Sequence, residues 1–377
     1  MMTLQKTKKN YDHYALILQG GGSLGAYHIG VYEALNKAAI KLDTIAGISI
    51  GAFTAAIIAG NEPENRLERL HAFWESISWP DFPKTPGIDQ MRTLHHKITS
   101  LQGVLFGQPN FFVPRFPGPQ LHPRGSIAAT SYYDTSRLKS TLKKYIDFDR
   151  INAKEMRLIL GATRVKDGEH VFFDNANMRI TPEHVMASGA MPPGFPGVRL
   201  EGDLYWDGGC VANTPLEQLF RSKKDENTLV FMVDLFTPFG DEPQDMEDVT
   251  IRSKDILYTS RTSHHIDHVI DRHNLSVALQ EALNSMPETQ KKIELQKSLR
   301  KIGNEYGHFD IVHIIYDSTK HKISSRDCEF SKSSLKSRSK YGFEDTEKIL
   351  TQAPWLKDRS INQAARVHKF IGGKVAS

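Results

Sequence analysis

Cysteines and long apolar runs are scarce in this chain. Only two of its 377 residues are cysteines, Cys210 and Cys328, which is too few for a disulfide framework and favours a reducing compartment. The longest apolar stretch, Ile45–Gly60, is shorter than a membrane-spanning helix needs and is interrupted by a serine and glycines. The first residues contain lysines but no apolar segment followed by a cleavage site, so no secretory signal is predicted. We expect a cytoplasmic protein whose membrane contact is peripheral.

Charge of one sign is not in large excess either. The formal net charge is +4 and the pI is about 8.8, while hydrophobic residues make up 39% and charged residues 24%. This composition is typical of a folded globular protein and excludes a disordered or membrane-spanning one. The basic balance permits contact with anionic lipid headgroups but requires no nucleic acid, and we expect no nucleic-acid partner.

Strands alternate with helices in the first two thirds of the chain. Continuous apolar segments typical of strands buried on both faces are Tyr14–Leu18, Thr44–Ile48, Arg157–Val165 and Thr228–Phe236. Between these strands, apolar residues at helical spacing or helix-capping residues predict helices at about 24–40, 52–59, 65–77, 136–146 and from Thr181 onward. The alternation predicts an α/β fold with a mainly parallel sheet covered by helices on both faces.

Two regions depart from this alternation. Residues 79–125 are rich in proline and phenylalanine, which rules out long regular elements and indicates an insertion. Beyond Gly240 the chain is mostly helical and charged, with one strand candidate at Asp310–Tyr316 and a Ser- and Lys-rich segment, Ser331–Lys340, interpreted as a loop or tail. We therefore predict a domain at 10–238, carrying the insertion, and a mostly helical C-terminal region at 239–377 of unassigned role.

The strongest chemical motif is Gly47-Ile48-Ser49-Ile50-Gly51, between a predicted strand and a small-residue helix. This is the context of a nucleophile elbow, in which a sharp turn exposes the serine and glycines at Gly47 and Gly51 avoid steric collision. Ser49 would also lie at a helix N-terminus, whose partial positive charge favours a developing oxyanion. The motif predicts Ser49 as a nucleophile.

A second motif, Gly20-Gly21-Gly22-Ser23-Leu24-Gly25, follows the first predicted strand. Main-chain N–H groups fixed by glycines can stabilise the negative charge that builds on an ester carbonyl oxygen. The same residues satisfy the dinucleotide-binding pattern G-x-G-x-x-G, with Asp43 as the nearest acid, but that acid precedes the second strand and the alternative leaves the serine motif unexplained.

A third motif is Asp207-Gly208-Gly209, directly after the apolar Leu204–Trp206. A serine hydroxyl needs a group that accepts its proton, and a carboxylate can do so if it reaches hydrogen-bond distance of Ser49. Alone, the tripeptide is most often a turn. A Ser–His–Asp triad is the alternative, although none of the 16 histidines lies in a recognisable motif.

Together and in this order, the three motifs resemble those of the patatin-like phospholipase family. The resemblance covers about 14–235 and includes Ala187-Ser188-Gly189-Ala190-Met191-Pro192-Pro193, similar to the family block before its aspartate. It implies a three-layer α/β/α sandwich, a Ser49–Asp207 dyad and activity on acyl lipids. The oxyanion hole would use main-chain groups among Gly20, Gly21, Gly22, Ser23 and Gly25.

One position departs from the family pattern. Many members carry Arg or Lys where this chain has Leu24, so a positive side chain beside the oxyanion is missing from the loop. The resemblance is closest to a bacterial subgroup with a G-G-G-x-L-G-A-Y loop and an additional C-terminal domain.

Other signals carry less weight. His264 and His268 share a helical face but lack the glutamate of a zinc motif, and we expect neither metal nor cofactor. Cys210 is interpreted as packing. Three phenylalanines of the insertion, Phe111, Phe112 and Phe116, form either a core-covering loop or a lipid-facing lid.

The sequence as a whole predicts a phospholipase A or lysophospholipase type of hydrolase, acting on a lipid ester at a membrane surface or micelle. The alternatives are a dinucleotide-binding protein and a catalytically quiet scaffold. The C-terminal region is a candidate surface for a protein partner or for a second copy of the chain.

Overall fold

The computed structural model describes residues 11–80, 106–216, 218, 226–301, 307–317, 329–358 and 364–376. Part of the predicted insertion, 81–105, lies outside the described residues, as does Cys328. No helix within the described ranges has both the length and the apolar character that crossing a bilayer requires.

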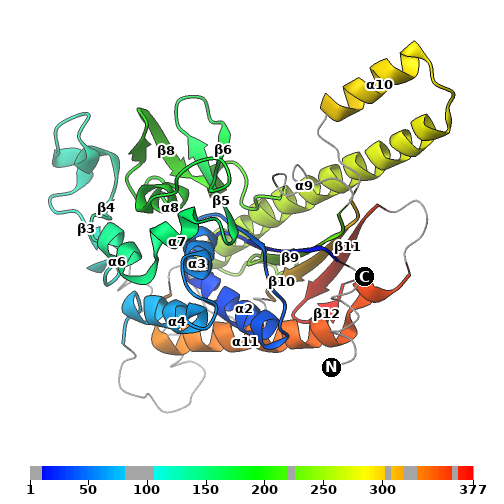
Figure 1. Ribbon diagram of the computed structural model, residues 1–377. Helices are drawn as coiled ribbons and strands as arrows, with labels where there is room; N and C mark the ends of the chain where they lie inside the picture. Colours follow the sequence, from blue (N-terminus) through cyan, green and yellow to red (C-terminus); the bar gives the residue numbers. More distant parts are fainter. Residues whose placement is uncertain are drawn as a thin grey trace.

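A single large sheet runs through the molecule (Figure 1). Ten strands of the described chain form it, in the order β12-β11-β10-β9-β1-β2-β5-β8-β7, with β6 paired to β5. Neighbouring strands from β11 to β5 are parallel, whereas β12, β6, β8 and β7 pair antiparallel. The bounds are β1 His13–Leu18, β2 Thr44–Gly47, β5 Arg157–Arg164, β6 His170–Asp174, β7 Val198–Leu200, β8 Asp203–Asp207, β9 Thr228–Asp234, β10 Phe309–Ile315, β11 Ala365–Ile371 and β12 Lys374–Val375.

The sheet has a hydrophobic core on each face. Along β1, Leu16 and Leu18 face one core, which contains residues of α2, α3 and α11, whereas Ala15 and Ile17 face the other, which contains Ile266 of α9. Alternate side chains of a strand point to opposite faces, so both sets must be apolar, and this is why the central strands read as unbroken apolar runs. The predicted three-layer α/β/α arrangement is confirmed.

The α-helices in the described ranges are α2 Tyr27–Lys37, α3 Ile50–Ala59, α4 Arg66–Ser76, α6 Leu138–Tyr145, α7 Phe148–Asn152, α8 Pro182–Ser188, α9 Met246–Ser285, α10 Gln290–Lys301 and α11 Lys332–Gln352. A short 3-10 helix, η1 Gly22–Ala26, precedes α2, and a two-stranded pair, β3 Val113–Pro114 with β4 Tyr133–Asp134, lies in the described part of the insertion. In Figure 1 the far end of α9 and the short α10 project away from the sheet.

The C-terminal region is built into the same sheet. Strands β10, β11 and β12 extend it beyond β9, and α11 packs along α2 (Figure 1). The predicted strand at Asp310–Tyr316 is β10, displaced by one residue. Strand β11 has no counterpart among the predicted elements.

The segment Ser331–Lys340 is not a loop or tail, and that prediction was wrong. Ser331 caps α11 by accepting a hydrogen bond from the Ser334 N–H at 3.4 Å, and Leu335, Arg338 and Ser339 are buried. Small polar side chains let this helix lie very close to α2, so its buried face is marked by size and not by hydrophobicity.

Two glycines make the close contact between α2 and α11 possible. A Cβ atom at Gly30 would lie 1.8 Å from the Ser339 carbonyl oxygen, and one at Gly342 would lie 2.1 Å from the Tyr27 carbonyl oxygen. The Tyr27 hydroxyl adds a hydrogen bond of 3.1 Å to Asp345. Backbone therefore meets backbone across this helix pair.

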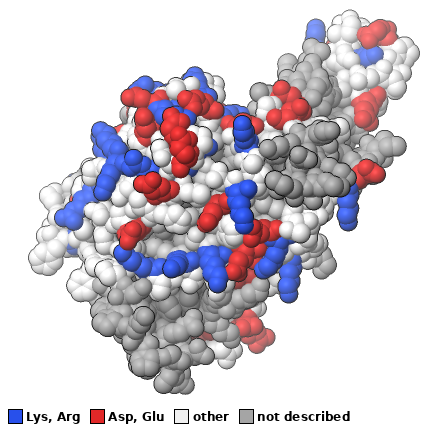
Figure 2. Space-filling view, turned by 60° about the horizontal axis from the view of Figure 1, so that its bottom comes forward, with Lys and Arg blue, Asp and Glu red and all other residues white. Residues whose placement is uncertain are grey.

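The outer surface near α11 mixes both charges (Figure 2). Lysines and glutamates pair across element boundaries, including Lys37 with Glu347 at 2.6 Å and Lys332 with Glu75 at 2.8 Å. Exposed pairs of this kind contribute little to stability, so the close packing of α11 against α2 matters more for holding α11 in place.

Candidate active site

The C-terminal ends of β2 and β8 meet along one edge of β5. β2 runs parallel to β5 and stops with Gly47 opposite Leu160, whereas β8 runs antiparallel and stops with Asp207 opposite Ala162. Both lie on the edge opposite β6, which pairs with the same stretch of β5 from its other side. Only Gly161 separates the two pairing positions, so the chain segments that follow β2 and end β8 are brought together.

Ser49 occupies the turn between β2 and α3 with φ 56° and ψ −128°, a left-handed backbone conformation that is costly for a serine. Its N–H donates to the carbonyl and the hydroxyl oxygen of Ser188, at 3.1 and 3.2 Å. A Cβ at Gly47 would lie 2.3 Å from the Gly51 carbonyl oxygen, and one at Gly51 would lie 2.2 Å from the Leu18 carbonyl oxygen. The sharp turn therefore requires both glycines.

Asp207 is fully buried behind Ser49. Its Oδ1 accepts a hydrogen bond of 2.7 Å from the Gly209 N–H, whereas Oδ2 has no partner of regular hydrogen-bond geometry among the described residues. Burial raises the pKa of Asp207 to about 7, and the neighbouring Ser49 hydroxyl and the Gly209 N–H offset part of this rise. The carboxyl group is thus adjacent to the serine and titrates near neutrality.

Asp203, the other acid of β8, lies at the opposite end of that strand and is partly exposed. The Cys210 thiol beside the Asp-Gly-Gly turn has a pKa raised to about 11 by burial and by the Asp207 charge. A thiol of this kind stays protonated, which agrees with a packing role.

The glycine loop lies across from Ser49. Gly20 donates its N–H to Asn213 Oδ1 at 3.2 Å, and Asn213 Nδ2 returns a bond of 2.8 Å to the Gly20 carbonyl oxygen. Gly22 has φ 56°, which favours glycine, and opens η1. The Gly20 N–H is used by Asn213, whereas Gly21 and Gly22 also line the pocket, so their N–H groups are the candidates for oxyanion donors. Ser23 is turned away from the cavity, and Gly25 packs against Ile50.

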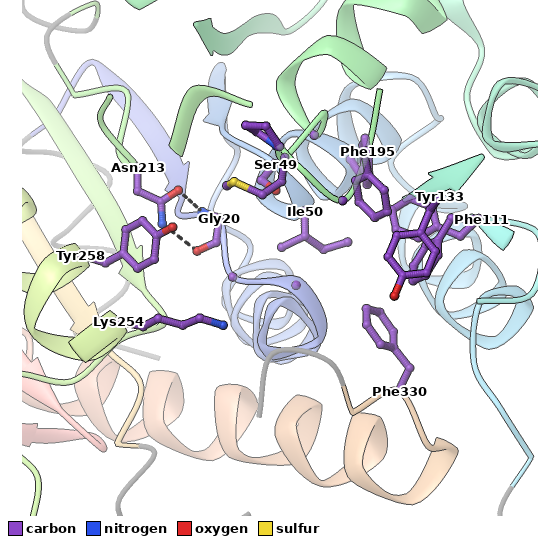
Figure 3. A pocket seen from close by; sticks show the side chains of 18 of the residues that line it. Gly20, Ser49, Ile50, Phe111, Tyr133, Phe195, Asn213, Lys254, Tyr258 and Phe330 are labelled. Atoms are coloured by element: carbon purple, nitrogen blue, oxygen red, sulfur yellow. Dashed lines mark hydrogen bonds between the residues drawn. The ribbon is translucent and has the colours of Figure 1, made fainter. Parts of the chain in front are cut away.

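These groups border an apolar pocket with a volume of about 430 Å³ (Figure 3). Ser49 and Gly20–Gly22 form its polar end, and its walls are mainly aromatic: Phe53, Phe111, Phe112, Tyr133, Phe195, Phe236, Tyr258 and Phe330. The volume lies toward the lower end of the roughly 300–1,000 Å³ of small-molecule sites. Among the described residues, no histidine lines this pocket. The arrangement fits one apolar chain with its reactive end at Ser49.

The phenylalanines of the insertion do not share one surface. Phe111 is 6% exposed and packs edge-on against Phe53 at 5.6 Å and Phe195 at 5.7 Å. Phe112 is half-buried and lines the pocket with it, whereas Phe116 is 97% exposed. Two of the three therefore belong to the pocket wall, and only Phe116 projects into solvent.

Four residues of the C-terminal region reach the site without a signal in the sequence. Lys254 and Tyr258 of α9, and Phe330 before α11, line the pocket (Figure 3). The buried Arg338 of α11 donates to the Ser23 carbonyl oxygen at 3.2 Å and to its hydroxyl at 2.8 Å. The loop itself has Leu24 where many family members have a basic residue, but the guanidinium of Arg338 contacts the loop from α11.

Two alternatives from the sequence, a dinucleotide site and a metal site, gain no support from the described residues. Asp43 precedes β2, at the edge of the sheet opposite the glycine loop, and accepts the Tyr14 N–H at 2.8 Å. In the described parts of the chain, no group of three or more His, Cys, Asp or Glu side chains is arranged to hold a metal ion.

Comparison with known families identifies the chain. The family model described as patatin-like phospholipase matches residues 16–220, more than half of the chain. The chain belongs to the patatin-like phospholipase family. A second model, described as patatin phospholipase, matches residues 256–361 and so covers much of the C-terminal region. Both matches agree with the family expected from the three motifs.

Several relatives share short segments with this patatin-like chain. Patatin-like phospholipase domain-containing protein 6 of Homo sapiens is 40% identical over 60 residues, which are 16% of this chain and 4% of that protein. Triacylglycerol lipase 4 of Saccharomyces cerevisiae is 39% identical over 61 residues, 16% of this chain and 7% of the relative. The chain thus spans less than a tenth of either relative.

Similarity to solved structures is low. VipD from Legionella pneumophila has a TM-score of 0.38 and 15% identity, covering 90% of this patatin-like chain and 67% of that chain. Human GIVD cytosolic phospholipase A2 has a TM-score of 0.38 and 11% identity, covering 68% of this chain and 50% of its own.

Proposed function

We propose that the protein is a serine acyl-hydrolase that cleaves carboxylic esters of lipids, of the phospholipase A or lysophospholipase type, with Ser49 as nucleophile and Asp207 as its general base. The observation that carries the proposal is the meeting of a strained, pocket-facing serine and a buried carboxyl group at the ends of β2 and β8. Membership of the patatin-like phospholipase family supports the ester-hydrolase class.

The reaction follows from this arrangement. Asp207 takes the proton of the Ser49 hydroxyl while Oγ attacks the ester carbonyl carbon, and the carbonyl oxygen becomes an oxyanion facing the Gly21 and Gly22 N–H groups. When the tetrahedral intermediate collapses, the carbon–oxygen bond to the alcohol breaks and the leaving alkoxide takes the proton from Asp207. Water then gives a proton to Asp207 and attacks the acyl-Ser49, and the proton returns to Ser49 as the fatty acid leaves.

The pocket supports a lipid acyl group as the part of the substrate that is bound. Its walls are mainly aromatic, and burial of apolar chain against them provides binding energy of roughly 25 cal/mol per Å². The exposed Phe116 and the basic charge balance fit a substrate presented at a membrane surface or a micelle.

The test is hydrolysis by matched pairs of variants. We expect Ser49→Ala and Asp207→Asn each to abolish fatty-acid release from phospholipid vesicles and from a p-nitrophenyl ester, because each removes one half of the proton transfer. Ser140→Ala, on the exposed face of α6, and Asp203→Asn, at the far end of β8, are the controls and should retain activity.

A fluorophosphonate probe should label the wild-type protein at Ser49 and leave Ser49→Ala unlabelled. Turnover retained in Ser49→Ala would refute the mechanism. A wild-type protein that reacts with neither ester nor probe would instead favour a catalytically quiet scaffold.

A further inference from the structure

Arg338 is a buried cation whose contacts point to the glycine loop. Its side chain comes from α11 and is 3% exposed. Nη1 donates to the Ser23 carbonyl oxygen at 3.2 Å, to the Ser23 hydroxyl at 2.8 Å and to the Glu329 carbonyl oxygen at 2.9 Å, while Nη2 faces the Glu329 carboxylate at 3.8 Å. A buried guanidinium needs such partners, and here they include main-chain atoms of the loop that faces Ser49.

The contact continues through the backbone toward the pocket. The peptide unit that presents the Ser23 carbonyl also carries the Leu24 N–H, which donates to the Gly21 carbonyl oxygen at 3.2 Å. The peptide unit of that carbonyl carries the Gly22 N–H, and Gly22 lines the pocket with Ser49. Hydrogen bonds in a chain polarise one another, so a positive charge at the first carbonyl strengthens the last N–H as a donor.

The position of Arg338 is set by the helix pair that carries it. Ser339, the next residue, has its carbonyl oxygen against Gly30 of α2, and Gly342 lies against Tyr27 one turn later. The glycine loop continues through η1 directly into α2. The helix against which α11 packs is therefore continuous with the loop that Arg338 contacts. Just before α11, Phe330 lines the pocket and stacks on Trp74, with the two ring centroids 6.3 Å apart.

We propose that Arg338 is a positioning residue of the active site, which holds the glycine loop in shape and strengthens the Gly22 N–H as an oxyanion donor. Arg338 is not among the residues that line the pocket, so it acts on the loop and not on the substrate. The proposal rests on the serine mechanism above and gives the C-terminal region a direct part in it.

Two substitutions test this role. Arg338→Met keeps an apolar stem of similar length but removes the charge and the donors, and should lower kcat about tenfold, less than the roughly 10²–10³-fold of losing an oxyanion donor itself. KM should stay within about twofold, because the pocket walls are unchanged. The rate of fluorophosphonate labelling of Ser49 should fall with kcat. Arg338→Lys keeps the charge and should recover part of the lost kcat.

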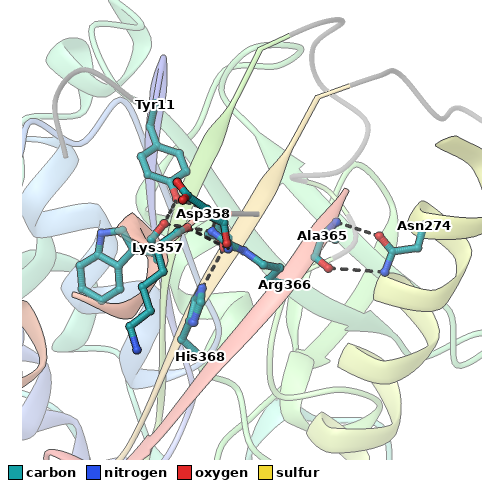
Figure 4. Close-up of polar contacts among 9 residues, drawn as sticks. Tyr11, Asn274, Lys357, Asp358, Ala365, Arg366 and His368 are labelled. Carbon is teal, nitrogen blue, oxygen red and sulfur yellow. Dashed lines mark hydrogen bonds and ion pairs between the residues drawn. The ribbon is translucent and has the colours of Figure 1, made fainter. Parts of the chain in front are cut away.

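Arg366→Met is the matched control. Arg366 is also a poorly exposed arginine in an ion pair, with Nε 2.7 Å from Asp310 Oδ1, and Nη2 donates to the Trp355 carbonyl oxygen at 2.9 Å (Figure 4). It lies near the start of β11, at the amino ends of the parallel strands and thus at the edge of the sheet away from the glycine loop. This variant should lower Tm without lowering kcat per folded molecule.

The outcomes separate the two proposals. Unchanged kcat in Arg338→Met, or a loss of kcat that Arg366→Met reproduces, overturns the role of Arg338 and leaves the serine mechanism standing. If Arg338→Met does not fold, the neutral polar variant Arg338→Gln decides, and a kcat equal to that of the wild type in that variant overturns the role. A wild-type protein that is inactive and unlabelled overturns the proposed function and this role with it.

Discussion

The burial of Asp207 costs stability, and under the proposed mechanism the same burial favours catalysis. Removing a carboxylate from water disfavours its charged form, and this raises its pKa to about 7 from an ordinary value near 3.8. A base whose pKa lies near the working pH is well suited to accept a proton and release it again.

We therefore expect activity and stability to change in opposite directions with pH. Between about pH 4 and 7 the folded protein holds a proton on Asp207 that the unfolded chain has lost, so the free energy of unfolding falls as pH rises through that window. The ionised form needed for catalysis is populated over the upper part of the same range. Asp207→Asn, which cannot ionise, should be inactive and should unfold at a higher Tm than the wild type at pH 8, with a gain on the order of a few kcal/mol.

Thermal unfolding of both proteins at pH 5 and pH 8 measures this, with Asp203→Asn as the control. The advantage of Asp207→Asn should shrink at pH 5. If Asp207→Asn is less stable than the wild type at both pH 5 and pH 8, the predicted cost of burying the Asp207 charge is contradicted.

At the scale of elements, the α2–α11 contact tolerates little added volume, because main-chain atoms fill the space beside Gly30 and Gly342. Gly342→Ala should push α11 away from Tyr27, with a cost of about 1–3 kcal/mol typical of overpacking. Because α11 carries Arg338, kcat should fall as well. Ser337→Ala, on the exposed side of α11, is the control for both measurements. If Gly342→Ala has the Tm and kcat of the wild type, the close packing of α11 against α2 is not needed for stability or activity.

The same elements show how far the sequence leads. The central strands were predictable because burial on both faces leaves an unbroken apolar run, and the three loop motifs were predictable because each imposes a local backbone geometry. Helix α11 was missed because most of its buried residues are small or polar, including Ser334, Ser339 and Gly342, and only Leu335 and Ile349 among them are apolar. Asn213 and Arg338 were missed because they contact the loop across 193 and 315 residues of sequence, and no local pattern encodes such pairs.

At the scale of the whole molecule, the predicted division at residue 238 crosses one continuous sheet. Strand β9 is buried between β1 and β10. Helix α11 packs on the same face of the sheet as α2 and contributes to the same hydrophobic core. Removing 239–377 would expose the apolar edge of β9 and part of the core, and exposed edges of this kind promote aggregation.

We expect a chain ending at residue 238 to lack cooperative unfolding and to aggregate, as measured by circular dichroism and size-exclusion chromatography. Deletion of α10 alone, with a short linker in its place, is the matched control and should leave a folded, active protein because that helix projects from the body (Figure 1). A monomeric, active chain of residues 1–238 would show that the first region folds by itself.

The head-to-head strand ends have one further consequence. The spacing between Ser49 and Asp207 is set by the peptide length of a neighbouring strand, through Leu160, Gly161 and Ala162, and none of the aromatic side chains that line the pocket takes part in it. Under the proposed function, substrate preference and the chemical step are thus encoded in separate parts of the chain. The aromatic walls can be exchanged to admit a longer, shorter or bulkier acyl group while the reacting pair keeps its distance.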